Sequence, residues 1–371
     1  MKIATFELER YFAKYEFSTK YLLSSSDCES LSMSELIEMA SQETLKAWQE
    51  LKLGYTEIYG HPLLRESIAE IYSSLKAENI LTVVPSEGIF LLMNTLLKPG
   101  DHIVCTFPGY QSLYEIAQSI GCDISFWQPQ EEQGWKFCIN DLRKKLQTNT
   151  KLVVANFPHN PTGYVPPLQD FHDLIDIVYQ QGAYLFSDEM YRFLETEETS
   201  TLPSASEIYD KAFSLFGLSK TFGLPGLRLG WMASQNNAIL EKMSQLKDYT
   251  TICGSAPSEI LAVMAIKNRQ QIIESQRQRI QRNLKHLNEF CQKHQDFITW
   301  NKPIGGSICF PRLSIAETTL QFCEKLVTDT GIMLLPSEVF NFGNKHVRIG
   351  FGRENFPQVL QILSDYLEKQ K

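Results

Sequence analysis

Short runs of apolar, often β-branched residues alternate along this chain with longer segments whose apolar residues recur at helical spacing. Seven runs are predicted as strands, at residues 80–84, 102–106, 123–127, 151–155, 183–187, 211–216 and 228–233. Helical patterns fit between several of them, at residues 88–98, 110–121, 140–146 and 168–181. Strand–helix alternation is typical of a mostly parallel sheet with helices on both faces. The pattern therefore predicts an α/β fold around a seven-stranded sheet.

The two ends of the chain follow other patterns. Residues 1–30 are rich in aromatics and are interpreted as an irregular arm, followed by a helix predicted over 34–51. After Pro257, a long polar stretch with apolar residues at helical spacing extends to about His294. A helix that long and that polar usually connects two bodies.

We therefore predict three parts. Residues 1–30 form an arm that completes a small domain and the active site, and residues 31–270 form a large domain. Residues 271–371 contain the bridging helix and the small α+β domain, with short strands predicted at 307–311, 332–335 and 346–351.

Composition narrows the possible functions. The chain has 371 residues, 43% of them hydrophobic, and a net charge of −8. That length can bury a core and exceeds one typical domain. No basic block is present, so neither nucleic acid nor an anionic membrane is an expected partner. The most apolar window, residues 80–97, is broken by Pro85 and Gly88, which indicates a strand, a turn and a helix rather than a membrane span.

The eight cysteines show neither a C-x-x-C pair nor a ligand-like spacing with histidine. The first residues also lack the apolar core of a secretory signal. We therefore expect reduced thiols in a cytoplasmic protein, with neither a disulfide framework nor a metal site.

Candidate chemistry collects where the predicted strands end. In an open parallel sheet, ligands bind beyond the carboxyl ends of the strands. The polar or aromatic residues at these positions are Ser86 and Glu87 at a helix start, Tyr110, Asn160, Asp188, Ser219 and Lys220. Each has an ordinary structural explanation, such as a helix cap, a turn or a solvated charge. The Asn160–Pro161 bond is also a candidate for the cis form.

Two arginines complete the pattern. Arg228 follows Lys220 past a Gly-Leu-Pro-Gly turn, and Arg348 interrupts an apolar strand, where a guanidinium needs an anion. Lys220 is either a solvated loop charge or an amine held for Schiff-base chemistry. The whole set fits pyridoxal 5′-phosphate (PLP), which needs a lysine, an acid facing its pyridine nitrogen, donors at its phenolic oxygen, a stacking ring and a phosphate cradle.

Eight motifs occur in an order that points to one family. They are Y-x-x-x-x-G at 55–60, LLR at 63–65, KPGD at 98–101, PGY at 108–110, HNPTG at 159–163, SDEMY at 187–191, SKTFGLPGLRLGW at 219–231 and VRIGF at 347–351. Across nearly its whole length the chain resembles a fold-type I PLP-dependent enzyme of the class I/II aminotransferase family. The resemblance implies a large PLP-binding domain and a small α+β domain.

The resemblance also implies roles around the cofactor ring. Lys220 would form the internal aldimine, and Asp188 would pair with the pyridinium nitrogen. Tyr191 and Asn160 would donate to the phenolic oxygen, while Tyr110 would stack on the ring.

Further roles are implied at the phosphate and at the substrate. The implied phosphate ligands are Ser86, the backbone N–H of Glu87, Ser219 and Arg228. Tyr55 of the partner subunit of a homodimer would reach the same phosphate, and Arg348 with Asn160 would bind the substrate carboxylate. Two positions depart from the family: Gly217 replaces a usual serine, and Pro85 replaces a residue with a free N–H. Both departures remove hydrogen-bond donors to the phosphate, so the resemblance does not define the complete set of phosphate ligands.

The implied activity is that of an aminotransferase in amino acid metabolism, which moves an amino group from an L-amino acid to a 2-oxo acid by a ping-pong aldimine/ketimine mechanism. PLP-dependent lyases, decarboxylases and cyclising synthases share these residues and remain alternatives. A non-catalytic PLP-binding sensor is a lesser alternative, because no basic winged-helix segment precedes the domain. An NAD-dependent enzyme is disfavoured, because no predicted strand is followed by G-x-G-x-x-G.

Overall fold

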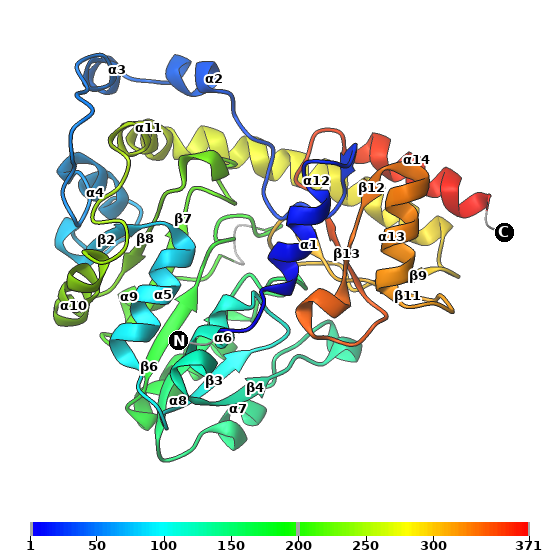
Figure 1. Cartoon of the computed structure of the whole chain (residues 1–371), viewed down its shortest axis with the longest axis horizontal. Helices are drawn as coiled ribbons and strands as arrows, with labels where there is room; N and C mark the ends of the chain where they lie inside the picture. The colour runs from blue at the N-terminus through cyan, green and yellow to red at the C-terminus, as the bar shows by residue number, and fades with distance from the viewer. Residues whose placement is uncertain (1–2, 198–200, 370–371) are drawn as a thin grey trace.

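The computed structural model describes residues 3–197 and 201–369, and its largest element is a seven-stranded sheet with the order β2-β8-β7-β6-β5-β3-β4 (Figure 1). The strands are β2 (Ile80–Val83), β3 (His102–Thr106), β4 (Asp123–Trp127), β5 (Thr150–Asn156), β6 (Tyr184–Asp188), β7 (Ala212–Gly217) and β8 (Gly230–Ala233). β8 is antiparallel to both of its neighbours, and the other pairs are parallel. The predicted α/β class and the mostly parallel sheet are confirmed.

One predicted strand starts too early. β8 begins at Gly230 rather than at Arg228. Arg228 has a left-handed backbone (φ +52°) and ends the 3₁₀ helix η4 (Pro225–Leu227). The arginine therefore lies in the turn before the strand, where its side chain is not confined by strand pairing.

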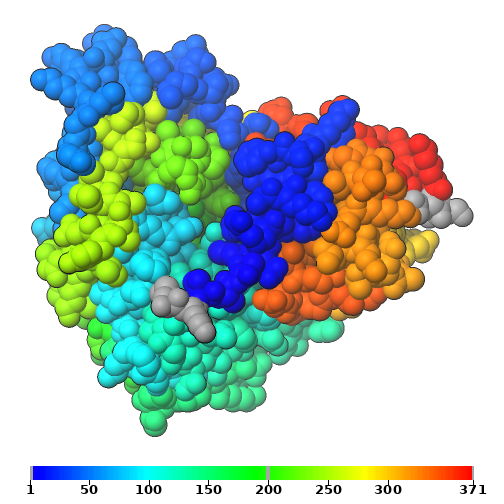
Figure 2. Space-filling model, in the orientation of Figure 1, coloured from blue at the N-terminus to red at the C-terminus, as the bar shows by residue number. Residues whose placement is uncertain are grey.

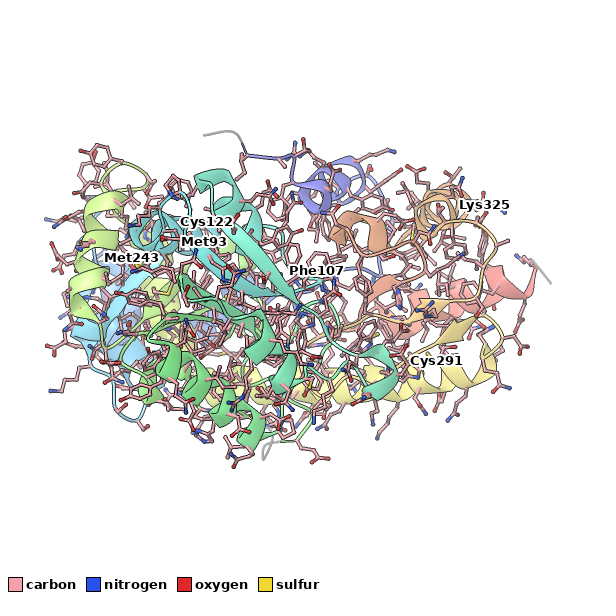
Figure 3. All side chains as sticks on the ribbon, turned by 90° about the horizontal axis from the view of Figure 1, so that it is seen from below. Met93, Phe107, Cys122, Met243, Cys291 and Lys325 are labelled. Carbon is pink, nitrogen blue, oxygen red and sulfur yellow. The ribbon has the colours of Figure 1, made fainter. Side chains whose placement is uncertain are left out.

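Side chains of the central strands alternate between the two faces of the sheet, as the two-residue period of a strand requires. In β5, Leu152 and Val154 belong to one hydrophobic cluster, whereas Val153 and Ala155 belong to another. The first cluster is covered by α5 (Pro85–Leu96), α6 (Ser112–Ile120) and α10 (Asn237–Lys247). The second is covered by α7 (Ile139–Lys145), α8 (Leu168–Gln181) and α9 (Ala205–Ile208). In Figure 3, Met93, Cys122 and Met243 of the first cluster lie together.

A third cluster lies at the edge of the sheet formed by β2 and β8. It packs α11 (Ala256–Lys267) against α3 (Gln42–Gln49), α4 (Pro62–Ala69) and the strand residue Trp231. The single helix predicted over 34–51 is wrong: α2 (Met33–Glu38) and α3 are separate, because Ser41 caps α3 by accepting the Thr44 N–H at 3.2 Å. The 3₁₀ helices η1 (Ala77–Asn79) and η2 (Glu131–Gln133) are short connectors.

The helix α12 (Arg269–Lys293) runs 25 residues from the sheet to the other end of the molecule, where Cys291 lies (Figures 1 and 3). The predicted stretch from Pro257 is divided at Asn268 into α11 and α12. A buried amide joins the C-terminal half of α12 to the segment after β14 (Val347–Gly350). Asn283 Nδ2 donates to the carbonyls of Phe351 (2.9 Å) and Arg353 (2.8 Å).

We call the elements from β9 to α14 the small body. It contains a three-stranded sheet of β10 (Ile308–Cys309), β14 (Val347–Gly350) and β13 (Leu335–Pro336), and a pair formed by β9 (Ile298–Thr299) and β11 (Arg312–Leu313). The helices are α13 (Thr319–Thr330), α14 (Phe356–Glu368) and η5 (Ser337–Phe340).

The N-terminal arm is not irregular, as predicted, but contains the helix α1 (Glu7–Tyr15) and the strand β1 (Tyr21–Leu22). β1 pairs in parallel with β12 (Ile332–Met333) of the small body. Lys14 forms an ion pair with Glu324 of α13 at 3.0 Å, and Gln111 of the sheet side accepts the Glu7 N–H at 3.0 Å. In Figure 2 the dark blue arm accordingly lies across the junction between the small body and the part of the molecule that contains the seven-stranded sheet.

Among the described residues, no helix combines the length and the apolar character that a membrane crossing needs.

Candidate functional site

A cavity of about 310 Å³ lies at the carboxyl ends of the strands and is enclosed by the arm and the small body. Nine of the predicted site residues line it: Ser86, Tyr110, Asn160, Asp188, Tyr191, Ser219, Lys220, Arg228 and Arg348. They come from separate loops and from β14, so only the fold brings them together. Glu87 and Tyr55 are the two predicted site residues outside this lining.

Asp188 is the last residue of β6, and its carboxylate is buried. The Met190 backbone N–H donates to its Oδ1 at 3.1 Å. No ion pair reaches it from the part of the chain that the structure describes. Burial, together with the negative charge of Glu189, raises the pKa of Asp188 to about 7, although the Met190 N–H and Lys220 oppose the shift. A cation in the cavity would stabilise the ionised carboxylate.

Lys220 follows β7 and is half-buried at the cavity wall. Its Nζ donates to the hydroxyl of Ser26 at 2.7 Å. Ser26 belongs to the arm, at a position that the sequence did not mark as functional. The amine is thus held inside the cavity rather than pointing to bulk water.

Arg348 is 2% exposed, and its guanidinium bonds only neutral acceptors. Nη2 donates to the Ser24 carbonyl at 2.9 Å, and Nη1 donates to Asn160 Oδ1 at 3.3 Å. None of the ion pairs among the described residues includes Arg348. Burial lowers its pKa, although the nearby Tyr191 and Asp27 oppose the shift. A buried guanidinium without an anion is costly, which favours an anionic ligand here.

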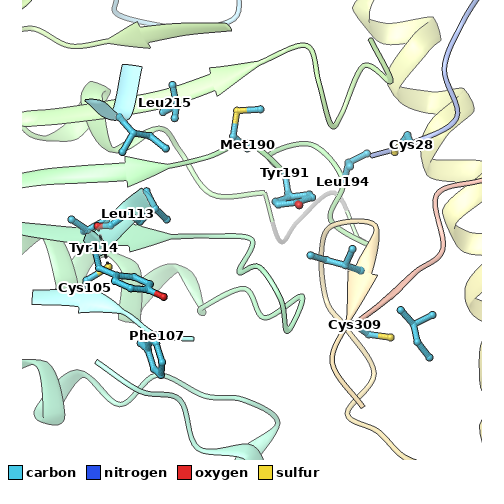
Figure 4. Close-up of a cluster of buried hydrophobic side chains, with 14 of the residues drawn as sticks. Cys28, Cys105, Phe107, Leu113, Tyr114, Met190, Tyr191, Leu194, Leu215 and Cys309 are labelled. Carbon is cyan, nitrogen blue, oxygen red and sulfur yellow. Dashed lines mark hydrogen bonds between the residues drawn. The ribbon is translucent and has the colours of Figure 1, made fainter. Parts of the chain in front are cut away.

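Tyr191 offers a second unsatisfied group. Its hydroxyl is buried and has no hydrogen-bond partner among the described residues. Figure 4 shows Met190 and Tyr191 beyond the tip of a sheet strand, as members of the hydrophobic cluster. Because buried hydroxyls normally find partners, this one is suited to a ligand atom in the cavity.

Tyr110 and Asn160 are oriented by their own neighbours. Tyr110 Oη donates to Glu9 Oε1 at 3.0 Å, and its ring lies 4.9 Å from the Phe6 ring. Burial raises the Tyr110 pKa, and the Glu9 charge adds to the effect. The Asn160 N–H donates to Asn156 Oδ1 at 2.7 Å, and the Asn160–Pro161 bond is cis, as the sequence suggested.

The start of α5 and the turn before β8 line one part of the cavity. The first N–H bonded within α5 is that of Gly88, to the Val84 carbonyl at 2.9 Å, so the N–H groups of Ser86 and Glu87 have no acceptor inside the helix. Such groups and the helix dipole favour a phosphate. Arg228 is exposed, lines the same cavity and donates to the Pro225 carbonyl at 2.9 Å.

The unusual Gly217 has a packing explanation. A Cβ at Gly217 would lie 2.8 Å from Gly230 Cα on the neighbouring strand and 3.4 Å from Pro85 Cγ. The close approach of β7 and β8 under Pro85 leaves no room for a serine. Gly217 and Pro85 are therefore coupled parts of one local arrangement.

Glu87 and Tyr55 lie elsewhere. The Glu87 carboxylate accepts hydrogen bonds from the hydroxyls of Thr250 and Thr251, the latter at 2.7 Å. Tyr55 is 91% exposed. The predicted roles of the Glu87 N–H and of Tyr55 stay predictions.

The sequence predicted that the arm completes the active site, but it identified none of the arm residues that line the cavity. Leu8, Glu9, Phe12 and Glu16 line it from α1 and its C-cap, and Ser25, Ser26 and Asp27 line it from the next segment. The spacing of residues 8, 12 and 16 is the four-residue spacing of one helix face. That signal was present, but the dense aromatics suggested an irregular segment.

The residues of the cavity fit PLP. A buried acid without a cation suits a protonated ring nitrogen, and the held lysine suits an aldehyde. The unpartnered Tyr191 hydroxyl suits the phenolic oxygen, while Arg228 and the start of α5 suit the phosphate.

Comparison with known proteins gives a consistent result. The sequence profile of the family described as aminotransferase class I and II matches residues 18–361. The chain is 30% identical to the capreomycidine synthase of Streptomyces vinaceus over 76% of this chain and 72% of the relative. It is 29% identical to the aspartate aminotransferase of Sulfolobus acidocaldarius over 85% and 82% of the two chains.

Among solved structures, a PLP-dependent aminotransferase from Streptococcus suis 89-1591 is similar over 100% of this chain and 99% of its own, with a TM-score of 0.93 and 31% identity.

Proposed function

The chain belongs to the aminotransferase class I and II family and is a PLP-dependent aminotransferase, and we propose that Lys220 and Asp188 carry its chemistry. Its substrates are an amino acid and a 2-oxo acid. The observation that carries the proposal is the shared cavity: the Lys220 amine, the buried Asp188 carboxylate and the Arg348 guanidinium all line it.

Bound PLP supplies an electron-withdrawing ring that stabilises negative charge at the substrate α-carbon. Asp188 favours the protonated ring nitrogen, because a nearby carboxylate stabilises a cation. Lys220, once its amine is free, moves the α-proton as a general base. Ser26 accepts a hydrogen bond from this amine and keeps it inside the cavity.

Arg348 binds the substrate α-carboxylate, and a guanidinium can do so with two parallel hydrogen bonds. Its contact with Asn160 Oδ1 and with the Ser24 carbonyl fixes the plane of the guanidinium. Asn160 and Tyr191 would donate to the phenolic oxygen of bound PLP, and Tyr110 would stack on its ring. Their positions in the lining support these roles.

The phosphate is bound by Ser86, the Glu87 N–H, Ser219 and Arg228. Because Gly217 cannot carry a hydroxyl, Arg228 and the start of α5 contribute more of the binding. Tyr55 of the partner subunit adds a hydroxyl to the same phosphate.

A homodimer is supported by exposed apolar residues on two loops that a hydrogen bond joins. Leu53 is 84% exposed, Tyr55 91%, Tyr249 88% and Ile252 47%. Lys247 Nζ donates to the Ile58 carbonyl at 2.6 Å and so joins the two loops that carry these residues. Contiguous exposed apolar residues commonly mark a protein–protein interface. Light scattering at micromolar concentration should give twice the monomer mass.

A cytoplasmic location is supported by the cysteines, because all eight are free thiols. Cell fractionation tests this proposal.

The central test replaces the lysine. Lys220→Ala should abolish amino transfer, whereas Lys242→Ala, which removes an exposed amine of α10, should leave the rate unchanged. Steady-state rates with varied amino acid and varied 2-oxo acid should give the parallel double-reciprocal lines of a ping-pong reaction. Full turnover by Lys220→Ala would remove the proposal.

The relative named capreomycidine synthase supports one alternative, a cyclising reaction on the same residues. Lyase and decarboxylase reactions would also use them. Omission of the 2-oxo acid separates these cases. An aminotransferase stops after one turnover, but a cyclising, lyase or decarboxylase reaction continues.

A further inference from the structure

The arm contributes two carboxylates to the cavity wall that the proposed reaction does not use. Glu9 and Glu16 line the cavity, three residues before and four residues after Phe12, and so lie on one face of α1. The Phe12 ring lies 5.8 Å from the Arg348 guanidinium. A substrate whose α-carboxylate binds Arg348 therefore lies beside this face of α1.

The other charged residues that line the cavity already have an assigned role or a partner. Among the described residues, the lining cations are Lys220, Arg228 and Arg348, which the proposed function assigns to the cofactor and to the α-carboxylate. Two of the lining acids also have partners. The proposed function assigns Asp188 to the ring nitrogen, and Asp27 forms an ion pair with Arg353 at 2.8 Å.

Glu9 and Glu16 differ in how far their carboxylates are satisfied. Glu9 accepts the Tyr110 hydroxyl at 3.0 Å. Glu16 is half-buried, and its carboxylate has neither a hydrogen bond nor an ion pair with any described residue. Burial raises the Glu16 pKa, and the negative charges of Asp27 and Glu9 add to that rise, while the positive charges of Lys220 and Arg353 oppose it. A partly buried carboxylate among other carboxylates is stabilised by a cation.

Acidic side chains alone do not define a ligand site. Glu9 and Glu16, however, line a cavity in which other residues also indicate that a ligand binds. Tyr191, 3% exposed, lines the same cavity with a hydroxyl that has no partner among the described residues. Arg348, 2% exposed, provides the anchor from which the substrate side chain extends.

We propose that the amino donor is an L-amino acid whose side chain ends in an ammonium or a guanidinium group, and that Glu16 binds this cation. Glu9 adds a second negative charge beside it. This inference rests on the proposed function, because it uses Arg348 as the α-carboxylate anchor. It also makes aspartate a poor donor, since a second substrate carboxylate would face Glu9 and Glu16.

The test compares donors that differ in charge but little in shape. L-Arginine is paired with L-citrulline, L-lysine with L-norleucine, and L-aspartate is added as the acidic donor. For the holoenzyme, kcat/KM with a fixed 2-oxo acid is measured for each. The apparent Kd is measured separately, from the change in cofactor absorbance on addition of the amino acid. At least one cationic donor should exceed its neutral partner by about 10-fold or more, as expected for a charge-assisted hydrogen bond.

Glu16→Gln keeps the size of the side chain and removes its charge. It should lower kcat/KM for the preferred cationic donor by about 10- to 100-fold and change that for the neutral partner by less than about 3-fold. Glu16→Asp, which keeps the charge, should retain part of the preference. Glu7→Gln is the matched control, because Glu7 lies on the exposed side of α1 and outside the cavity lining.

Two outcomes would overturn the inference: equal losses for charged and neutral donors in Glu16→Gln, or a higher kcat/KM for aspartate than for every cationic donor. Lys220-dependent transfer from neutral or acidic donors alone would keep the proposed function and reject this inference. If no donor supports transfer to a 2-oxo acid, yet arginine or lysine raises the melting temperature of the wild type and not of Glu16→Gln, Glu16 binds the side-chain cation and the proposed amino transfer fails.

Discussion

At the residue scale, the Asp188 carboxylate lies buried at the end of β6 with a pKa raised to about 7. Between its ordinary value of 3.8 and that value, the folded protein binds a proton that the unfolded chain has released. The contribution of Asp188 to the free energy of unfolding is therefore present at low pH and is lost as pH rises through this window. Bound PLP with a protonated ring nitrogen would reverse the loss.

Asp188→Asn tests this directly. In cofactor-free protein, the melting temperature of the wild type relative to the variant should fall as pH rises from about 4 to about 7. His159, whose pKa burial lowers to about 3, changes stability in the opposite direction but is present in both proteins, so it cancels in the difference. A difference that is constant with pH would show that the Asp188 carboxylate is not destabilised by burial.

Ser26 is the arm residue closest to the proposed chemistry, since its hydroxyl accepts the Lys220 hydrogen bond at 2.7 Å. Ser26→Ala should lower kcat by about 2- to 10-fold with little change in KM, because one hydrogen bond to the amine is lost. Ser26→Thr should recover most of the rate, and Ser30→Ala, at an exposed position of the same segment, should have no effect. A rise in KM without a fall in kcat would contradict a positioning role for Ser26.

At the element scale, two facing glycines allow β7 and β8 to approach each other closely. The registry pairs Gly217 with Gly230, and a side chain at either one meets backbone or Pro85. The departure of Gly217 from the family pattern is therefore a property of this strand pair, and restoring a serine would not restore a phosphate ligand.

Gly217→Ser should destabilise the protein by about 1–3 kcal/mol, the usual cost of overpacking, and should weaken rather than strengthen PLP binding. Denaturant unfolding and equilibrium titration with PLP measure the two effects. Gly226→Ser is the matched control, because nothing lies within 4 Å of a Cβ placed there. Tighter PLP binding by Gly217→Ser would show that the strands can separate to admit the hydroxyl.

Elements differed in how well the sequence predicted them. The strands of the sheet were found to within about two residues, since buried parallel strands are continuous runs of β-branched residues. The arm helix α1 was missed, because the dense aromatics of residues 1–30 suggested an irregular segment although the helical spacing was present. The break between α2 and α3 depends on a single cap at Ser41.

At the scale of the whole molecule, the exposed Tyr55 predicts active sites shared between two subunits. Lys220→Ala and Tyr55→Ala should each be inactive or weak at limiting PLP. If the subunits of the two variants are mixed and exchanged at random, about a quarter of the sites should contain both intact residues. Activity of the mixture should rise to that level, whereas no gain would show that Tyr55 acts within its own subunit or not at all.

The sequence by itself determined the α/β class, the positions of the strands along the chain and the polar residues at the strand ends. These features depend on local periodicity and on residues next to each strand in the sequence. It also determined the family, through motifs that keep their order along the chain. Only the tertiary structure decided which residues face one another across the cavity. The contact of Ser26 with Lys220, and the place of Glu16 in the wall beside Arg348, join segments about 200 to 330 residues apart. No local pattern encodes such contacts, since they arise when the arm packs across the junction of the two bodies.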